Sequence, residues 1–392
     1  MAMDFEPWWL VLLPLLFIAG WLARGVDRRL QSRESGAAPR SMFRGLNLLL
    51  NEKPDQAIDA FIEVVRLDPE TIELHYALGN LFRRRGEIDR AVRIHNYLLN
   101  RADLPARERS TALAELAQDY LKGGLLDRAE EAFTRLLDDR PHRLAALRAL
   151  LSIYEMEGEW LRAIDTAGAL QREAGETHST AIAHFRCELA ERARAAGDDD
   201  TAQRELELAL AGERRSVRAL ALQGDLLARR GDTAGAIRNW RSIEREAPQF
   251  LPLVAERLAA ALDAAGQRPA ARAMLERGLR EQPSFDMLDL AFRSVLAWEG
   301  AAAAEQLLRD ELKRHPSLLG FERLLALRAG TGGPADPELD QLRQLLQVQS
   351  RKLARFRCER CGFRAREFHW QCPGCKGWDS YPPRRVEDIE GQ

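Results

Sequence analysis

The sequence predicts an all-α protein: a solenoid of helical hairpins with one transmembrane helix at its N-terminus and a small metal-binding domain at its C-terminus. Three observations carry this prediction. A glycine with an alanine five residues later recurs about every 34 residues, residues 7–23 contain no charged side chain, and two Cys-x-x-Cys pairs lie close together near the C-terminus. A solenoid suits a chain of 392 residues, because each repeat packs only on its neighbours and no single large core is needed.

Residues 1–23 are predicted to form a transmembrane anchor. The uncharged stretch would form about 25 Å of helix, close to the roughly 30 Å of a hydrocarbon core. Tryptophans favour the headgroup boundary, and they lie at both ends of the stretch: Trp8, Trp9 and Trp21. A cleaved signal peptide and an amphipathic surface segment are the alternatives. A signal peptide needs a basic start, whereas this one carries Asp4 and Glu6, which favours the uncleaved anchor.

Positive charge follows the anchor and predicts its orientation. Six arginines lie just after it: Arg24, Arg28, Arg29, Arg33, Arg40 and Arg44. The positive-inside rule then places the N-terminus in the periplasm and the rest of the chain in the cytoplasm. Residues 24–37 are polar and lack a packing pattern, so they are predicted to be a cytoplasmic linker that reaches at most about 50 Å.

Residues 38–330 are predicted to form about eight helical hairpins. The glycine supplies a left-handed residue that ends the first helix, and the small alanine lets the second helix lie close. The pairs are Gly86–Ala91, Gly124–Ala129, Gly158–Ala163, Gly197–Ala202, Gly231–Ala236 and Gly266–Ala271, with Gly300 four residues before Ala304 and Ala57 opening the series. This period and pattern resemble the tetratricopeptide repeat, whose hairpins stack into a superhelix.

In tetratricopeptide arrays the first helix of each hairpin lines a concave groove that binds protein segments. The resemblance places seven residues there: Tyr76, Asn80, Arg83, Gln118, Lys122, Asp225 and Arg229. A solvated helix face is the alternative for each of them. Longer steps near residues 100–108 and 175–185 indicate insertions. The second carries His178 and His184, which fit no metal motif with Glu176 and Cys187 and are expected to be incidental.

The sequence predicts no enzyme and no catalytic residue. It contains no phosphate-cradling glycine loop, no nucleophile elbow and no His-Glu-x-x-His motif. The net charge of −2 gives no whole-molecule field that would attract nucleic acid.

The C-terminal region is predicted to contain a linker and a helix in residues 331–354, the helix from about Pro337 to Leu353, and a metal-binding domain in residues 355–392. Two Cys-x-x-Cys turns can close a tetrahedral four-thiolate site on one iron or zinc ion. The ligands would be Cys358, Cys361, Cys372 and Cys375. Free thiols need a reducing compartment, which agrees with the cytoplasmic placement.

The two cysteine pairs, Cys-x-x-Cys-Gly-Phe and Cys-Pro-Gly-Cys, resemble the knuckles of rubredoxin, with a shorter loop between them than in electron-carrying rubredoxins. A membrane-tethered electron carrier is therefore one alternative function. A nucleic-acid-binding zinc ribbon is another, because aromatic residues alternate with basic ones around the cysteines; they are Phe356, Phe363, Phe368 and Trp370. Acidic residues dilute that charge, so no nucleic acid is expected. The domain is expected to pack against the last repeats and fix their end.

An anchor, about eight repeats and a rubredoxin-like cap, in this order and at this length, resemble the lipopolysaccharide assembly protein B (LapB/YciM) family over the whole chain. The resemblance implies a single-pass protein of the inner membrane of a Gram-negative bacterium, with most of the chain on the cytoplasmic side. It implies a non-enzymatic adaptor that helps the membrane protease FtsH degrade the deacetylase LpxC and that gathers other lipopolysaccharide assembly proteins. A homo-oligomer is left open.

Overall fold

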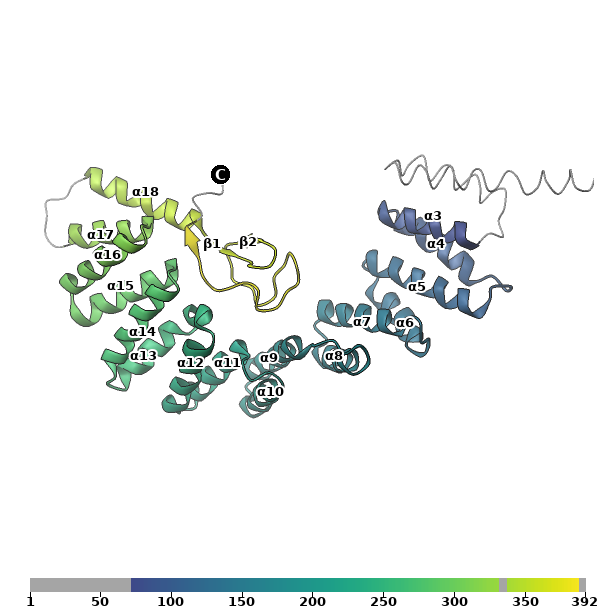
Figure 1. Cartoon of the computed structure of the whole chain (residues 1–392), viewed down its shortest axis with the longest axis horizontal. Coiled ribbons are helices and arrows are strands. Elements are labelled where there is room, and N and C mark those ends of the chain that lie inside the picture. Colours follow the sequence, from purple (N-terminus) through teal and green to yellow (C-terminus); the bar gives the residue numbers. More distant parts are fainter. Residues whose placement is uncertain (1–71, 331–336, 388–392) are drawn as a thin grey trace, which may run out of the picture. The chain divides into compact units, whose positions relative to one another are not determined.

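The computed structural model describes residues 72–330 and 337–387, which are mostly helical (Figure 1). The chain forms two compact units, Met1–Gly158 and Glu159–Gln392. The predicted anchor with Trp8, Trp9 and Trp21, the linker, and the first repeat around Ala57 lie outside the described residues. Within the described residues, no helix combines the length and the apolar character that a membrane crossing requires.

Helices in antiparallel pairs make up both units. The first unit contains α3 (Ile72–Arg84), α4 (Ile88–Leu99), α5 (Ala106–Lys122), α6 (Leu126–Arg135), the short 3-10 helix η1 (Leu136–Asp138) and α7 (Arg143–Glu157). The second contains α8 (Trp160–Ala174), α9 (Ser179–Ala195), α10 (Asp199–Gly212), α11 (Val217–Arg229), α12 (Thr233–Glu246), the 3-10 helix η2 (Pro248–Leu253), α13 (Ala255–Ala264), α14 (Arg268–Glu281), α15 (Phe285–Glu299), α16 (Ala301–Arg314) and α17 (Leu318–Gly330).

The repeating glycines and alanines have the roles that the sequence predicts. All seven glycines, from Gly86 to Gly300, have φ between 69° and 86°, a range in which a Cβ is disfavoured. The seven alanines that follow them, from Ala91 to Ala304, are at most 1% exposed. Within each unit, the glycine therefore ends one helix, and the alanine lets the next helix approach it closely.

A second kind of glycine lies inside a helix and makes room for a large ring of the partner helix. A Cβ built on Gly224 in α11 would lie 2.4 Å from Trp240 Nε1 in α12. In the first unit, a Cβ on Gly79 in α3 would lie 2.3 Å from His95 Nε2 in α4. Both rings occur four residues after the buried alanine of their repeat, so the two hairpins use the same packing.

Replacing Gly224 by alanine is expected to destabilise the second unit by about 1–3 kcal/mol, because the added methyl overpacks a rigid contact. Gly212→Ala is the matched control, since it lies at the end of α10 and a Cβ there would meet nothing within 4 Å. The control should be neutral or stabilising by up to about 1 kcal/mol. Urea unfolding of both variants measures the difference; equal midpoints would contradict the packing argument.

The C-terminal part of the second unit contains the small sheet that the sequence did not predict. Helix α18 spans Pro337–Leu353, as expected, and leads directly into β1 (Ala354–Arg357). Strand β1 pairs antiparallel with β2 (Arg364–Ala365) and β3 (Val386–Glu387), in the order β2-β1-β3. We call residues 355–387 the metal module. Helices α9–α17 curve around it (Figure 1).

Candidate metal centre and its docking surface

The four cysteines of the metal module converge on one point. Their sulfur atoms all lie within 4.8 Å of one another. Cys358 Sγ is 3.8 Å from Cys375 Sγ, and Cys361 Sγ is 3.7 Å from Cys372 Sγ. Zinc–sulfur bonds of about 2.3 Å at tetrahedral angles would place the sulfurs about 3.8 Å apart. The rubredoxin-like module could therefore hold one metal ion, and its sulfur geometry fits zinc or iron equally.

Each cysteine pair lies in a backbone turn of the same design. The amide of Cys358 donates to Phe363 O at 2.8 Å, and the amide of Cys372 donates to Gly377 O at 2.9 Å. The residue after each second cysteine is left-handed: Gly362 has φ 76° and Lys376 has φ 56°. In the second turn the glycine comes one residue later, at Gly377. It is needed there for space, since a Cβ would lie 2.9 Å from Ser380 Oγ.

The surroundings of Cys358 favour the thiolate that a metal needs. Burial disfavours the charged form of Cys358, but hydrogen bonding to Ser380 and to backbone amides outweighs it and lowers the pKa of this thiol to about 6. Ser380 Oγ lies 3.5 Å from Cys358 Sγ. At Cys361 a backbone amide favours the thiolate, but burial and hydrogen bonding with the other three thiols outweigh it and raise the pKa. Behind the sulfurs, Tyr381 is fully buried, and its hydroxyl donates to Phe356 O at 3.2 Å. Burial raises the pKa of Tyr381 to about 12, so this side chain stays neutral.

The metal module contacts α9 through a stack of rings. His184 is 1% exposed, and its ring stacks on Trp378 with centroids 4.3 Å apart. His184 Nε2 lies 3.0 Å from Asp379 Oδ1. The edge of Trp378 also meets Phe185, with centroids 5.9 Å apart. The expectation that His184 is incidental was wrong: it is a main contact between repeats and module. One feature of the sequence could have indicated this role: the repeat register places His184 on the first helix of its hairpin.

A second contact surrounds Trp370, two residues before a candidate ligand. Its ring stacks on Phe250 of η2 at 6.1 Å, and the guanidinium of Arg218 from α11 lies 5.9 Å from its centroid. Phe368 packs edge-on against Trp370 at 4.9 Å, and both pack against the core of the second unit. Phe368 and Trp370, two of the aromatic residues that a nucleic-acid-binding ribbon would expose, therefore serve internal packing, whereas Phe363 is 38% exposed.

A third contact ties the end of the module to the start of α15 and the residues just before it. Arg385 forms a two-pronged ion pair with Asp286, and its carbonyl accepts from the amide of Phe285 at 2.9 Å. Arg384 lies 3.5 Å from Gln282 Oε1. The three contacts together span α9 to α15. The module thus packs along the first helices of several repeats, which is wider than the expected contact with the last repeats alone.

The residues predicted to line the groove of the first unit mostly bind neighbouring repeats. Arg83 pairs with Glu115 at 2.5 Å and with Asp119 at 2.9 Å on α5, and Asn80 accepts from the same guanidinium. Tyr76 donates to the carbonyl of Glu108 at 2.8 Å. Asp119 is fully buried and also lies 2.6 Å from His95 Nδ1. These residues join successive first helices.

The remaining predicted groove residues divide into two kinds. In the second unit Asp225 pairs with Arg257, and Arg229 pairs with Asp199, so both link neighbouring helices. In the first unit Gln118 is half-buried and Lys122 is exposed, and within the described residues neither has a hydrogen-bond or ion-pair partner. Of the predicted residues in the second unit, neither Asp225 nor Arg229 contacts the metal module in the described structure. The module instead contacts His184, Phe185, Arg218, Phe250, Phe285 and Asp286.

Cys187 is expected to be inert while the four module cysteines react. It is fully buried in α9, and burial raises the pKa of its thiol to about 12. At pH 8 only about one molecule in 10⁴ would carry the reactive thiolate. Removing the metal with a chelator should unfold the module and expose its four cysteines, whereas Cys187 stays inside a packed helix. A thiol-reactive dye should then label the four module cysteines, and Cys187 only in denaturant. Labelling of Cys187 in the native chain, judged against a Cys187→Ala variant, would contradict this.

Comparison with known proteins extends the structural findings. Residues 356–382 match the rubredoxin metal binding domain family, and residues 44–103 and 114–176 match the tetratricopeptide repeat family. A chain in the solved structure of Naa15/Naa10 bound to HypK-THB has a TM-score of 0.53 at 17% identity, over 84% of this chain and 48% of that one. This likeness shows the solenoid fold alone.

Two curated relatives match nearly from end to end. Lipopolysaccharide assembly protein B of Escherichia coli strain K12 is 33% identical over 381 residues, which cover 96% of this chain and 98% of the relative. The protein of the same name from Haemophilus influenzae strain Rd is 27% identical over 387 residues, covering 95% and 97%. Repeats, metal module and full-length similarity agree, and the chain belongs to the lipopolysaccharide assembly protein B family.

Proposed function

We propose that this chain is a non-enzymatic adaptor in lipopolysaccharide assembly. The observation that carries the proposal is a four-cysteine module packed along the first helices of a repeat solenoid, in a chain similar to lipopolysaccharide assembly protein B over 96% of its length. Repeat solenoids present extended surfaces that bind other proteins. The adaptor helps the membrane protease FtsH degrade the deacetylase LpxC, and it gathers other lipopolysaccharide assembly proteins.

In this proposal the metal has a structural role. Cys358, Cys361, Cys372 and Cys375 bind one iron or zinc ion, supported by sulfur separations of 3.7–3.8 Å in two of their pairs. The bound ion supplies the folding free energy that a module of this size lacks. Trp370 and Trp378 closely flank the second cysteine pair. Closing the metal site therefore fixes the two rings that meet α9, α11 and η2.

The adaptor acts from the membrane. Residues 1–23 span the inner membrane with the N-terminus in the periplasm and Trp8, Trp9 and Trp21 at its two faces, and the repeats stay on the cytoplasmic side. A protease and its substrate held on one tethered scaffold meet at an effective concentration that is in the millimolar range for short linkers. Degradation then accelerates without any bond chemistry by the adaptor.

In the first unit, Gln118 and Lys122 are the predicted groove residues available to a partner.

Crosslinking in intact cells tests the proposal. A photoreactive amino acid at Lys122, which is exposed, should capture FtsH or LpxC, and the LpxC level should rise when residues 1–23 are deleted. The same photoreactive residue in a Cys372→Ser/Cys375→Ser background serves as a comparison. An LpxC level that stays normal in both the deletion and the cysteine variant would overturn the proposed function.

A further inference from the structure

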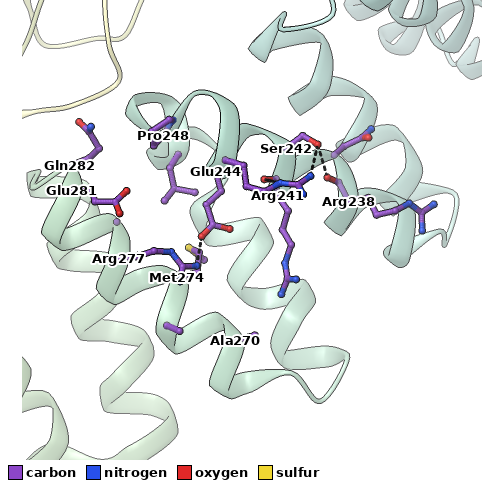
Figure 2. A pocket seen from close by; sticks show the side chains of 15 residues that line it. Arg238, Arg241, Ser242, Glu244, Pro248, Ala270, Met274, Arg277, Glu281 and Gln282 are labelled. Carbon is purple, nitrogen blue, oxygen red and sulfur yellow. Dashed lines mark hydrogen bonds and ion pairs between the residues drawn. The ribbon is translucent and has the colours of Figure 1, made fainter.

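A groove of about 1110 Å³ lies between α12 and α14 in the second unit (Figure 2). These are the second helices of two neighbouring hairpins. The metal module, by contrast, contacts α9, α11, η2 and the start of α15. The concave surface that repeat proteins usually offer to partners is therefore covered by the chain itself at those contacts, whereas the groove between α12 and α14 is open.

One wall of the groove is a row of arginines. Arg238, Arg241 and Arg245 lie three and four residues apart on α12, so they share one helix face. In the part of the chain that the structure describes, none of them pairs with a carboxylate. Arg245 donates only to Arg241 O at 3.3 Å and to Ser242 Oγ at 3.4 Å. Three guanidinium groups are thus available to an anionic ligand.

The floor of the groove is apolar, and the opposite wall on α14 combines alanines with Arg277 and Glu281. Ala270 and Ala273 line the α14 side, and Leu251 and Met274, which are 2% and 1% exposed, lie beneath. Figure 2 shows Glu244 of α12 joined to Arg277 of α14, a pair 2.5 Å apart that holds the two walls together. The groove carries four arginines against two glutamates, in a chain whose net charge is −2.

The size of the groove suits a short helix. An α-helix about 10 Å across rises 1.5 Å per residue and fills on the order of 120 Å³ per residue, so the groove has room for about nine residues, or two to three turns. A helix laid in a groove buries one apolar face and keeps its flanks polar. Here the apolar face would meet the alanines, and acidic flanks would meet the arginine row.

We infer that the groove between α12 and α14 binds an acidic amphipathic helix of a partner protein. This inference rests on the proposed adaptor function and names the kind of segment that the adaptor holds. A flat membrane surface fits the site less well, because the apolar floor lies between two helices and Glu244 and Glu281 line the same groove.

The test uses the full chain, loaded with zinc and held in phosphatidylcholine nanodiscs. The probe is a fluorescein-labelled 16-residue helical peptide with leucines along one face and glutamates beside them, and its partner peptide has lysine in place of glutamate. Arg241→Glu/Arg245→Glu should weaken binding of the acidic peptide about tenfold or more, because each change turns an attraction into a repulsion. Arg214→Glu/Arg215→Glu carries the same charge change at two exposed arginines outside the groove and should alter affinity less than twofold.

Binding of the acidic peptide alone, lost in the groove variant and kept in the control, supports the inference. Equal binding of the lysine peptide, or equal affinity in both variants, overturns it. Loss of peptide binding when the discs contain phosphatidylglycerol would assign the groove to lipid headgroups and also overturn it. These outcomes leave the adaptor function itself untouched, since that function fails on the LpxC level of the deletion and cysteine variants.

Discussion

Replacing Cys372 and Cys375 by serine is expected to unfold the metal module and release it from the repeats, while the helices of both units stay folded. Structural zinc contributes on the order of 10–16 kcal/mol in zinc-finger peptides at neutral pH, more than any packing in this module can replace. Its own core consists of Phe356, Tyr381 and two of the cysteines. Without two ligands, little remains to hold Trp370 and Trp378 in position.

Hydrogen exchange at the start of α15 reports this release directly. The first amides of a helix have no partner within the helix, and the amide of Phe285 instead donates to Arg385 O of the module at 2.9 Å. Its protection should be lost in the double serine variant and after chelation of the metal. Cys187→Ala, in a helix that contacts the module but outside the cysteine cluster, should keep it. Protection that survives metal removal would show that the module docks without its ion.

Much of the solenoid could be predicted because its signals are local. Left-handed turns need glycine, and close helix contacts need alanine. A pair such as Gly231 and Ala236 therefore indicates a hairpin from the local sequence alone. The four cysteines are similar, since their spacing alone limits which metal sites can form. The sheet could not be predicted in this way, because strands of two to four residues are too short to show an alternating pattern.

The docking surface could not be predicted from the sequence, because its contacts join residues that are far apart in the chain. His184 and Asp379 are 195 residues apart in the chain, and no periodicity connects them. The predicted groove residues were chosen by register, which gives the helix face but not the partner. Arg83 lies on a first helix as expected, yet Asp119 of the next repeat binds its guanidinium. Register thus predicts where a side chain lies, whereas only the packed structure shows what it contacts.

Replacing His184 and Trp378 together by alanine is expected to undock the module without emptying its metal site. The two rings stack at 4.3 Å, and His184 also lies 3.0 Å from Asp379 Oδ1. Removing a buried tryptophan commonly costs about 3–5 kcal/mol; because Trp378 is only partly buried, we expect a loss of about 2–4 kcal/mol of docking free energy. The zinc or iron content should stay the same as in the unmodified chain, since neither residue is a candidate ligand.

This variant distinguishes the effect of metal binding from the effect of docking, because it removes the docking contact and keeps the metal. Phe321→Ala is the matched control, because it removes an exposed aromatic ring from α17, away from the residues that contact the module. If docking is what regulation requires, the His184 and Trp378 variant should raise the LpxC level as much as the double serine variant does, although its metal remains bound. If instead the LpxC level stays normal while the Phe285 amide has lost its protection, the module acts as a free metal-binding domain, and the contacts along α9 to α15 serve stability alone.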